Sequence, residues 1–274
     1  MQDKLFFRYS ERRCGVTILE VWNVDRRIVD SAEDSRHTRY YATQFRIRRV
    51  DFGIILFIIA ILGLESKIND KLQGIYNVAL KELNEFFGIH WVRNLPRLIV
   101  VSDRRTIDDM FGRKTDRWVV GWVENNNIYV LDKDKFPAES DHVRYSDEQY
   151  AMLIKHEMSH AFSLIVAKGE IRPKWLWEGV AVYTSGQNTS YSRPTVFKSF
   201  LDCFDNDGKG VYSEAGFATQ LLHDTYGKQK ILDMLKMSSK LKTKDEFDSA
   251  FKSVFGFNPR YEEFNILLSS GKTP

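Results

Sequence analysis

The residues best suited to catalytic chemistry form an HExxH motif, His156-Glu157-Met158-Ser159-His160. Two histidines four residues apart share one face of a helix, so both imidazoles can bind the same metal ion. Glu157 is rotated by about 100° from His156, which places its carboxylate beside the ion, where it can act as a base. The motif therefore predicts a metal site on a helix.

A catalytic zinc site takes three protein ligands and leaves a further position for water, so a third donor must come from elsewhere. The candidate is Glu178, eighteen residues after His160, in the sequence Trp175-Leu176-Trp177-Glu178-Gly179-Val180-Ala181-Val182-Tyr183. A turn at residues 169–173 can fold this second helix back antiparallel to the first. Small residues on the second helix allow the two helices to approach closely.

HExxH followed at this interval by W-x-x-E-G-x-A-x-Y resembles the gluzincin zinc metallopeptidases, the thermolysin-like group. The resemblance covers residues 97 to about 240, and it includes a small sheet whose edge strand binds the peptide substrate. It implies that Zn²⁺ is held by His156, His160 and Glu178. It also implies that Glu157 is the catalytic general base.

The resemblance further implies a catalytic donor for the oxyanion, which family members often take from a tyrosine or histidine in the helical half. Tyr212, at the start of a predicted helix, is the first candidate, and His223 is the second. Packing in the core is the alternative role for Tyr212. Tyr183 lies about 140° around the helix from Glu178 and is expected to face away from the metal. Trp177 replaces the asparagine that many gluzincins carry before the ligand glutamate. The sequence therefore does not identify the residues that form hydrogen bonds to the metal ligands.

The stretch Gly121-Trp122-Val123-Glu124-Asn125 is similar to the G-x-M-E-N sequence by which gluzincin aminopeptidases hold the amine of a substrate. Val123 replaces the methionine. Glu124 and the three asparagines that follow it also suit an ordinary hairpin turn, which is the favoured interpretation.

An EF-hand-like pattern lies further along the chain. Its ligand positions are occupied by Asp205, Asp207 and Glu214, with Gly208 at the position of the sharp turn. Cys203 stands at the first ligand position, and a soft thiol is a poor ligand for calcium. The pattern therefore predicts a polar loop between helices.

Hydrophobic periodicity and turn residues predict a mixed first half for the main body of the chain. We expect a helix at residues 68–87, a β-strand at 97–102, a short helix at 103–111 and a β-hairpin formed by 118–123 and 128–131. Ser146 and Gln149 have capping-box spacing and open the HExxH helix, which can run to Lys168.

The pattern beyond Pro173 is helical, with no strand signal after residue 132. Thr243 with Glu246 forms a second capping box, and Asn258-Pro259 predicts a helix with proline at its first position. The other expected helices cover residues 174–184, 194–204, 213–226 and 228–237. The predicted fold class is α+β, a small thermolysin-like sheet plus the HExxH helix, followed by an all-helical C-terminal half.

The composition of the chain argues against several classes of protein, among them nucleic-acid-binding and disulfide-rich proteins. Hydrophobic residues make up 43% of the chain and charged residues 28%, values typical of a soluble globular protein. The net charge of +3 divides into +4 for residues 1–50 and −1 for the remainder, so nothing supports nucleic-acid binding. Cys14 and Cys203 are too few for a disulfide framework or a cysteine zinc site.

The apolar run at residues 52–64 follows three arginines, which is the order of a secretory signal. Its 13 residues are fewer than the about 20 that span a bilayer, and a short signal anchor is the alternative. A buried core helix is a further alternative, which N-terminal sequencing of the mature protein would distinguish. The expected organisation is a leader at 1–65, with the signal or anchor at about 46–65, and a peptidase domain at 66–274 with a mixed lobe at 66–186 and a helical lobe at 187–274.

These patterns predict a zinc-dependent peptidase that acts on a peptide or protein substrate outside the cytoplasm, secreted or attached to the membrane through residues 52–64. The alternative is a catalytically inactive zinc-binding domain that serves as a structural or interaction module. A membrane-embedded metalloprotease is disfavoured because the HExxH helix carries Lys155, Glu157 and Lys168. Cleavage specificity, the choice between internal and terminal bonds, and the oligomeric state stay open.

Overall fold

The computed structural model describes residues 5–12, 16–23, 69–142, 145–208 and 210–270. The chain divides into two compact units, Met1–Leu62 and Gly63–Pro274. In the first unit, β1 (Leu5–Arg12) and β2 (Val16–Asn23) pair as an antiparallel hairpin that the sequence patterns do not predict. The apolar run at 52–64 lies outside the described residues.

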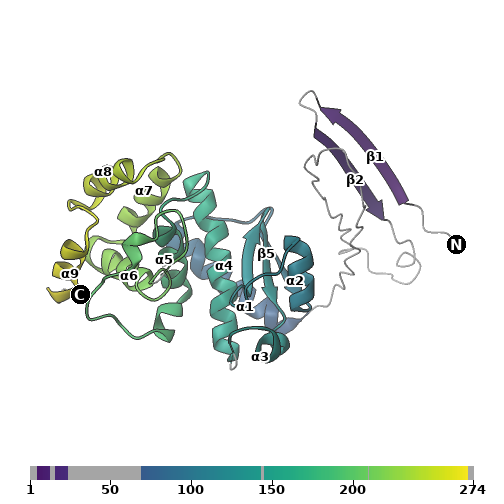
Figure 1. Cartoon of the computed structure of the whole chain (residues 1–274), viewed down its shortest axis with the longest axis horizontal. Helices are drawn as coiled ribbons and strands as arrows, with labels where there is room; N and C mark the ends of the chain where they lie inside the picture. Colours follow the sequence, from purple (N-terminus) through teal and green to yellow (C-terminus); the bar gives the residue numbers. More distant parts are fainter. Residues whose placement is uncertain (1–4, 13–15, 24–68, 143–144, 209, 271–274) are drawn as a thin grey trace. The chain divides into compact units, whose positions relative to one another are not determined.

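The second unit begins its described part with α1 (Asp70–Phe87), followed by a three-stranded sheet and α2 (Arg104–Phe111) (Figure 1). In the sheet, β5 (Asn127–Leu131) lies in the middle, parallel to β3 (Arg97–Val101) and antiparallel to β4 (Gly121–Glu124). The predicted helices, strand and hairpin are confirmed, although β4 begins three residues later than expected.

The hairpin between β4 and β5 has an ordinary two-residue turn. Asn125 and Asn126 adopt positive φ angles of 48° and 62°, a conformation that asparagine tolerates better than most residues. Glu124 ends β4 and is exposed. The stretch at 121–125 thus consists of strand β4 and the first residue of the turn that the asparagines favour.

The HExxH motif lies on α4 (Asp147–Ala167), which the predicted capping box opens. The Ser146 hydroxyl accepts from the Gln149 backbone N–H, and the Gln149 side chain accepts from the Ser146 backbone N–H. The helix packs against α1, α5, α7, β4 and β5. Residues 156–163 are therefore buried on every side of the helix, which requires their polar groups to find partners or a ligand.

The next helix, α5 (Lys174–Ser185), runs back along α4. Trp177 stacks on His160 near the start of α5, whereas Gly186, just past its end, lies close to Met152. The contacts advance along α5 as they retreat along α4, so the predicted antiparallel arrangement is confirmed.

On its other side, α5 packs against α6 (Ala215–Tyr226) through glycine. A Cβ atom at Gly179 would lie 2.7 Å from the Ala215 carbonyl oxygen, and one at Gly216 would lie 2.4 Å from Val182 Cγ1. A side chain at Gly179 would therefore press on the α6 backbone, and one at Gly216 would displace the Val182 side chain. The close approach fixes α5 between α4 and α6.

The C-terminal half is helical, as predicted, with α7 (Lys228–Ser238), α8 (Lys244–Phe255) and α9 (Tyr261–Ser269) following α6 (Figure 1). The predicted capping box of Thr243 and Glu246 opens α8. These helices enclose an aromatic cluster that Trp175 joins from α5. Its other large members are Phe200, Phe247, Phe251 and Phe264.

Short elements complete the described part: η2 (Lys133–Lys135), α3 (Phe136–Glu139), η3 (Gln187–Ser190) and η4 (Phe200–Asp202). Within that part, none of the helices combines the length and apolar character that a membrane span requires. The fold is α+β, mostly helical with one small sheet in this unit.

One helix prediction is wrong, and another helix is present but begins later than predicted. The segment 194–204 contains only the turn η4, because the backbone N–H groups of Lys198, Ser199 and Phe200 donate to the Glu214 side chain and not to earlier carbonyl oxygens. Helix α9 begins at Tyr261 rather than at the predicted proline two residues earlier.

Candidate metal centre

His156, His160 and Glu178 converge between α4 and α5. The Nε2 atom of His156 lies 3.2 Å from Glu178 Oε2, and the Nε2 atom of His160 lies 3.4 Å from the same oxygen. One ligand atom from each residue lies within 4.8 Å of the others. All three residues are at most 5% exposed. The structure thus brings the three predicted ligands together as a buried group that can hold a metal ion.

The spacing of the histidines along α4 and the packing of α5 against α4 position this group. One turn of α4 separates the two histidines, whose ring centroids are 4.7 Å apart in an edge-to-face arrangement. Neither Nδ1 atom has a hydrogen-bond partner among the described residues. Trp177 stacks on His160 at 4.1 Å with 10° between the ring planes. The residue that departs from the gluzincin pattern therefore packs against one of the candidate ligands.

Two of the three candidate ligands have the charge states that suit metal binding. Burial raises the pKa of Glu178, but the neighbouring imidazoles of His160 and His156 outweigh it and hold that pKa well below its usual value. Burial lowers the pKa of His160 to about 4, against the opposing effect of Glu178. At neutral pH Glu178 is therefore ionised and His160 is neutral, the forms that bind metal ions. Burial lowers the pKa of His156, but Glu178 and Glu157 outweigh it and raise that pKa above its usual value, so metal binding displaces a proton from His156.

Glu157 lies beside the group and faces strand β4. A Cβ atom at Gly121 would lie 2.8 Å from Glu157 Oε1, so only glycine leaves room for the carboxyl group. The side chain is 6% exposed, and burial raises its pKa to about 7, with His156 opposing and Glu178 assisting the rise. A carboxyl group that titrates near neutral pH can take up and return a proton.

The two candidate oxyanion donors are in different places. The ring of Tyr212 lies 6.3 Å from that of His156, and burial, assisted by Glu178, raises the pKa of Tyr212 so that its hydroxyl keeps its proton. His223 is paired instead with Tyr183, whose hydroxyl oxygen is 2.9 Å from His223 Nδ1. Tyr183 is thus directed towards His223 on α6, and Tyr212 is the candidate next to the centre.

Three further side chains reach this region without having been predicted. Lys174 Nζ lies 2.8 Å from Glu178 Oε1. Burial and then Glu178 raise the pKa of Tyr191, while burial, Tyr191 and Glu157 raise that of Tyr145. The four-residue spacing of Lys174 and Glu178 is a sequence signal for an ion pair on a helix. The tyrosines precede or follow helices and have no such signal.

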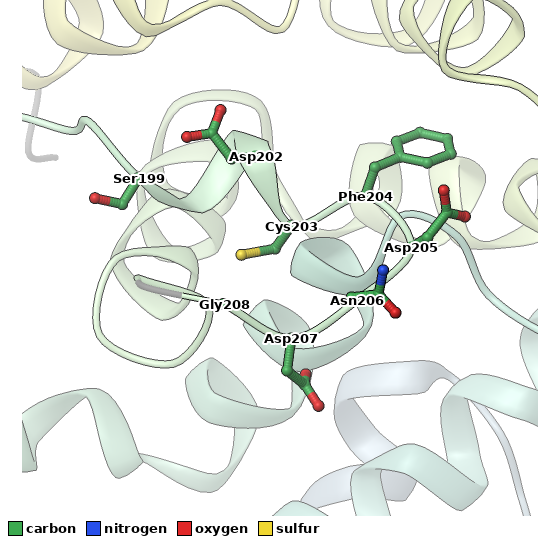
Figure 2. Close-up of a pocket in the computed structure, with 8 residues that line it drawn as sticks. All are labelled: Ser199, Asp202, Cys203, Phe204, Asp205, Asn206, Asp207 and Gly208. Carbon is green, nitrogen blue, oxygen red and sulfur yellow. The ribbon is translucent and has the colours of Figure 1, made fainter.

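The EF-hand-like segment lines a pocket that contains none of the three candidate ligands (Figure 2). The carboxylates of Asp202, Asp205 and Asp207 point in different directions from the loop. Asp205 pairs with Arg172 at 3.4 Å, and Glu214 accepts the backbone N–H groups described above. The structure therefore gives the polar loop that the sequence favours. The pocket is lined by Ser199, Asp202, Cys203, Phe204, Asp205, Asn206, Asp207 and Gly208.

Comparison with known proteins assigns the chain to no family. No protein-family model matches it, and no curated protein sequence matches it. The function must therefore be argued from the geometry of the centre.

Proposed function

We propose that this protein is a zinc-dependent peptidase that hydrolyses peptide bonds in a peptide or protein substrate. The observation that carries the proposal is the buried carboxyl group of Glu157 beside the three converging ligands. A structural zinc site closes its coordination with four protein ligands, whereas the group found in the described residues has three. Three ligands and an adjacent base favour catalysis over a purely structural role.

Zinc suits the donor set. Two imidazole nitrogens and one carboxylate oxygen are the ligand types of a catalytic zinc site with two histidines and one glutamate. The Glu178 oxygen lies 3.2 Å and 3.4 Å from the nitrogens of His156 and His160. When bound, zinc lowers the pKa of a water molecule towards about 7 and polarises a carbonyl group.

The remaining chemistry belongs to side chains of this chain. Glu157 takes a proton from the attacking water and returns it to the leaving amine. Tyr212, which keeps its hydroxyl proton, donates a hydrogen bond to the oxygen that becomes negative. Strand β4 lies at the edge of the sheet and meets Glu157 at Gly121. An extended peptide paired along that edge has its backbone next to the base.

The resemblance to the gluzincins agrees with this proposal. Two ligands on one helix, a glutamate on the next and a small sheet beside them are the arrangement that the resemblance implies. We also propose that the enzyme acts outside the cytoplasm, exported or anchored through residues 52–64. In this scheme the peptidase domain is 66–274, with lobes 66–186 and 187–274.

The test is the variant Glu157→Gln, because an amide keeps the shape of the side chain but cannot take up the proton. We expect peptide hydrolysis to fall by about 10²–10⁴-fold, with the zinc content unchanged. Mass spectrometry of a mixed peptide library measures cleavage, and metal analysis measures zinc.

Glu148→Gln is the matched control, since Glu148 lies exposed in the first turn of the same helix. It should cleave like the unaltered protein. Undiminished hydrolysis by Glu157→Gln would refute the proposal. A zinc-loaded native protein that cleaves no peptide in broad libraries would favour the inactive zinc-binding domain.

A further inference from the structure

Lys174 occupies the first position of α5, four residues before the ligand Glu178. Its Nζ atom lies 2.8 Å from Glu178 Oε1, whereas Oε2 faces His156 and His160. The side chain of Glu178 is 5% exposed and that of Lys174 is 29% exposed. Each carboxylate oxygen therefore has its own partner, one on the metal side and one on the side of the lysine.

This division matters because the terminal torsion of a glutamate is broad and does not by itself fix which oxygen faces the ligand group. Ligand carboxylates in metal sites are usually oriented by an outer hydrogen bond. A buried carboxylate also carries a large desolvation cost unless a positive group offsets it. The ammonium group of Lys174 meets both needs.

The loop at residues 203–208 fixes the lysine in turn. Asp207 Oδ1 lies 3.5 Å from Lys174 Nζ. The same loop accepts two backbone N–H groups at the start of α5: Lys174 donates to the Phe204 carbonyl at 2.7 Å, and Trp175 donates to the Cys203 carbonyl at 3.0 Å. The start of α5 and the loop are thus joined by backbone and side-chain contacts.

A second lysine provides a comparison within the chain. Lys244 is the first residue of α8 and pairs with Asp248, four residues later, at 2.8 Å. Its side chain is 56% exposed and that of Asp248 is 32% exposed. Pairs of this kind contribute little to stability. The spacing is the same at both helices, but only Lys174 contacts a carboxylate that belongs to the metal centre.

We propose that Lys174 is a positioning residue for the metal ligand Glu178, and that Asp207 holds Lys174 in place. This inference rests on the metal centre of the proposed function but not on peptide cleavage. The lysine holds Oε1 so that Oε2 stays directed at the two histidine nitrogens. The polar loop thereby acts on metal affinity without contributing a ligand.

The experiment measures zinc affinity of the full chain by competition with a chromophoric chelator. Lys174→Met keeps the aliphatic stem and removes the charge, and we expect affinity to fall by about 10–100-fold, as for other outer partners. Lys174→Arg, which keeps the charge and an N–H donor, should recover most of that loss. Lys244→Met is the matched control and should bind zinc like the unaltered protein.

Asp207→Asn tests the outer link in a residue whose side chain is 38% exposed and tolerates substitution. It should weaken zinc binding by less than Lys174→Met does. Circular dichroism confirms that each variant is folded. Unchanged affinity in folded Lys174→Met overturns the inference, and so does an equal loss in Lys244→Met. A native protein that binds zinc but cleaves no peptide defeats the proposed function and leaves this inference standing.

Discussion

Two groups of side chains in this chain have the sequence spacing of metal ligands, but only one of them converges in the structure. His156, His160 and Glu178 come from two helices and converge within 4.8 Å. The carboxylates of the EF-hand-like loop diverge, with Asp205 paired to Arg172 and Glu214 bound to backbone N–H groups. Spacing thus becomes a site only where the backbone directs the side chains to one point.

The physical cause is the difference between helix and loop. A helix sends residues four apart to one face, and tight packing of α4 and α5 keeps that face opposite the glutamate. A loop has no fixed period, so each acidic side chain pairs with the nearest cation or N–H donor. In the loop these partners are Arg172, Lys174 and the backbone of residues 198–200.

The largest effect that separates the two groups should come from Glu178→Gln. Loss of a ligand oxygen should weaken zinc binding by more than the about 10–100-fold typical of outer partners. Chelator competition measures the affinity. Glu170→Gln, at an exposed surface pair, is the control and should bind zinc normally. Native affinity in Glu178→Gln would remove this residue from the ligand set.

Glu214→Ala, in the EF-hand-like group, should have a smaller effect, and on stability rather than on zinc binding. Its Oε2 atom accepts three backbone N–H groups, which the variant leaves without that acceptor. We expect the free energy of unfolding to fall by about 1–3 kcal/mol, with zinc content unchanged. Denaturant titration measures this change.

Glu214→Gln keeps an acceptor oxygen and should lose less stability than Glu214→Ala. If Glu214→Ala instead lost zinc while its stability stayed at the native value, the loop would belong to the metal centre. That result would remove the contrast between the two groups.

The smallest effect should follow from adding calcium to the zinc-loaded protein. A ligand that binds the folded state raises its stability, and the divergent loop carboxylates offer calcium no common site. The thermal unfolding midpoint should therefore not change. A rise that disappears in Asp205→Asn would show that the loop gathers its carboxylates around calcium.

Local signals predicted the elements that carry the centre. The capping box at Ser146 gives the start of α4, and the HExxH spacing gives the shared face of the two histidines. Glu178 could be found because a short turn allows α5 to lie against α4, although the small residue Gly179, expected at that contact, packs against α6 instead. All of these features act over a few residues or between neighbouring helices, which is the range that periodicity and turn chemistry cover.

The errors arise where partners distant in sequence decide the structure. The backbone N–H groups of residues 198–200 donate to the side chain of Glu214, more than a dozen positions later, and not to the carbonyl oxygens of a helix. The contact of Gly121 with Glu157 depends on how the sheet packs on α4 and leaves no local signal. The outer role of Asp207 likewise depends on how the loop meets the start of α5.

The enclosure of α4 has a consequence for the lifetime of the centre. Helices on several sides and two strands of the sheet cover it, and its middle residues are buried. Backbone amides in such an element exchange with solvent mainly through global unfolding, whereas loops and chain ends open locally and often. The two histidines thus lie on a helix that we expect to open less often than the loops. Fluctuations of the outer loops therefore leave the imidazoles of the two histidines in place.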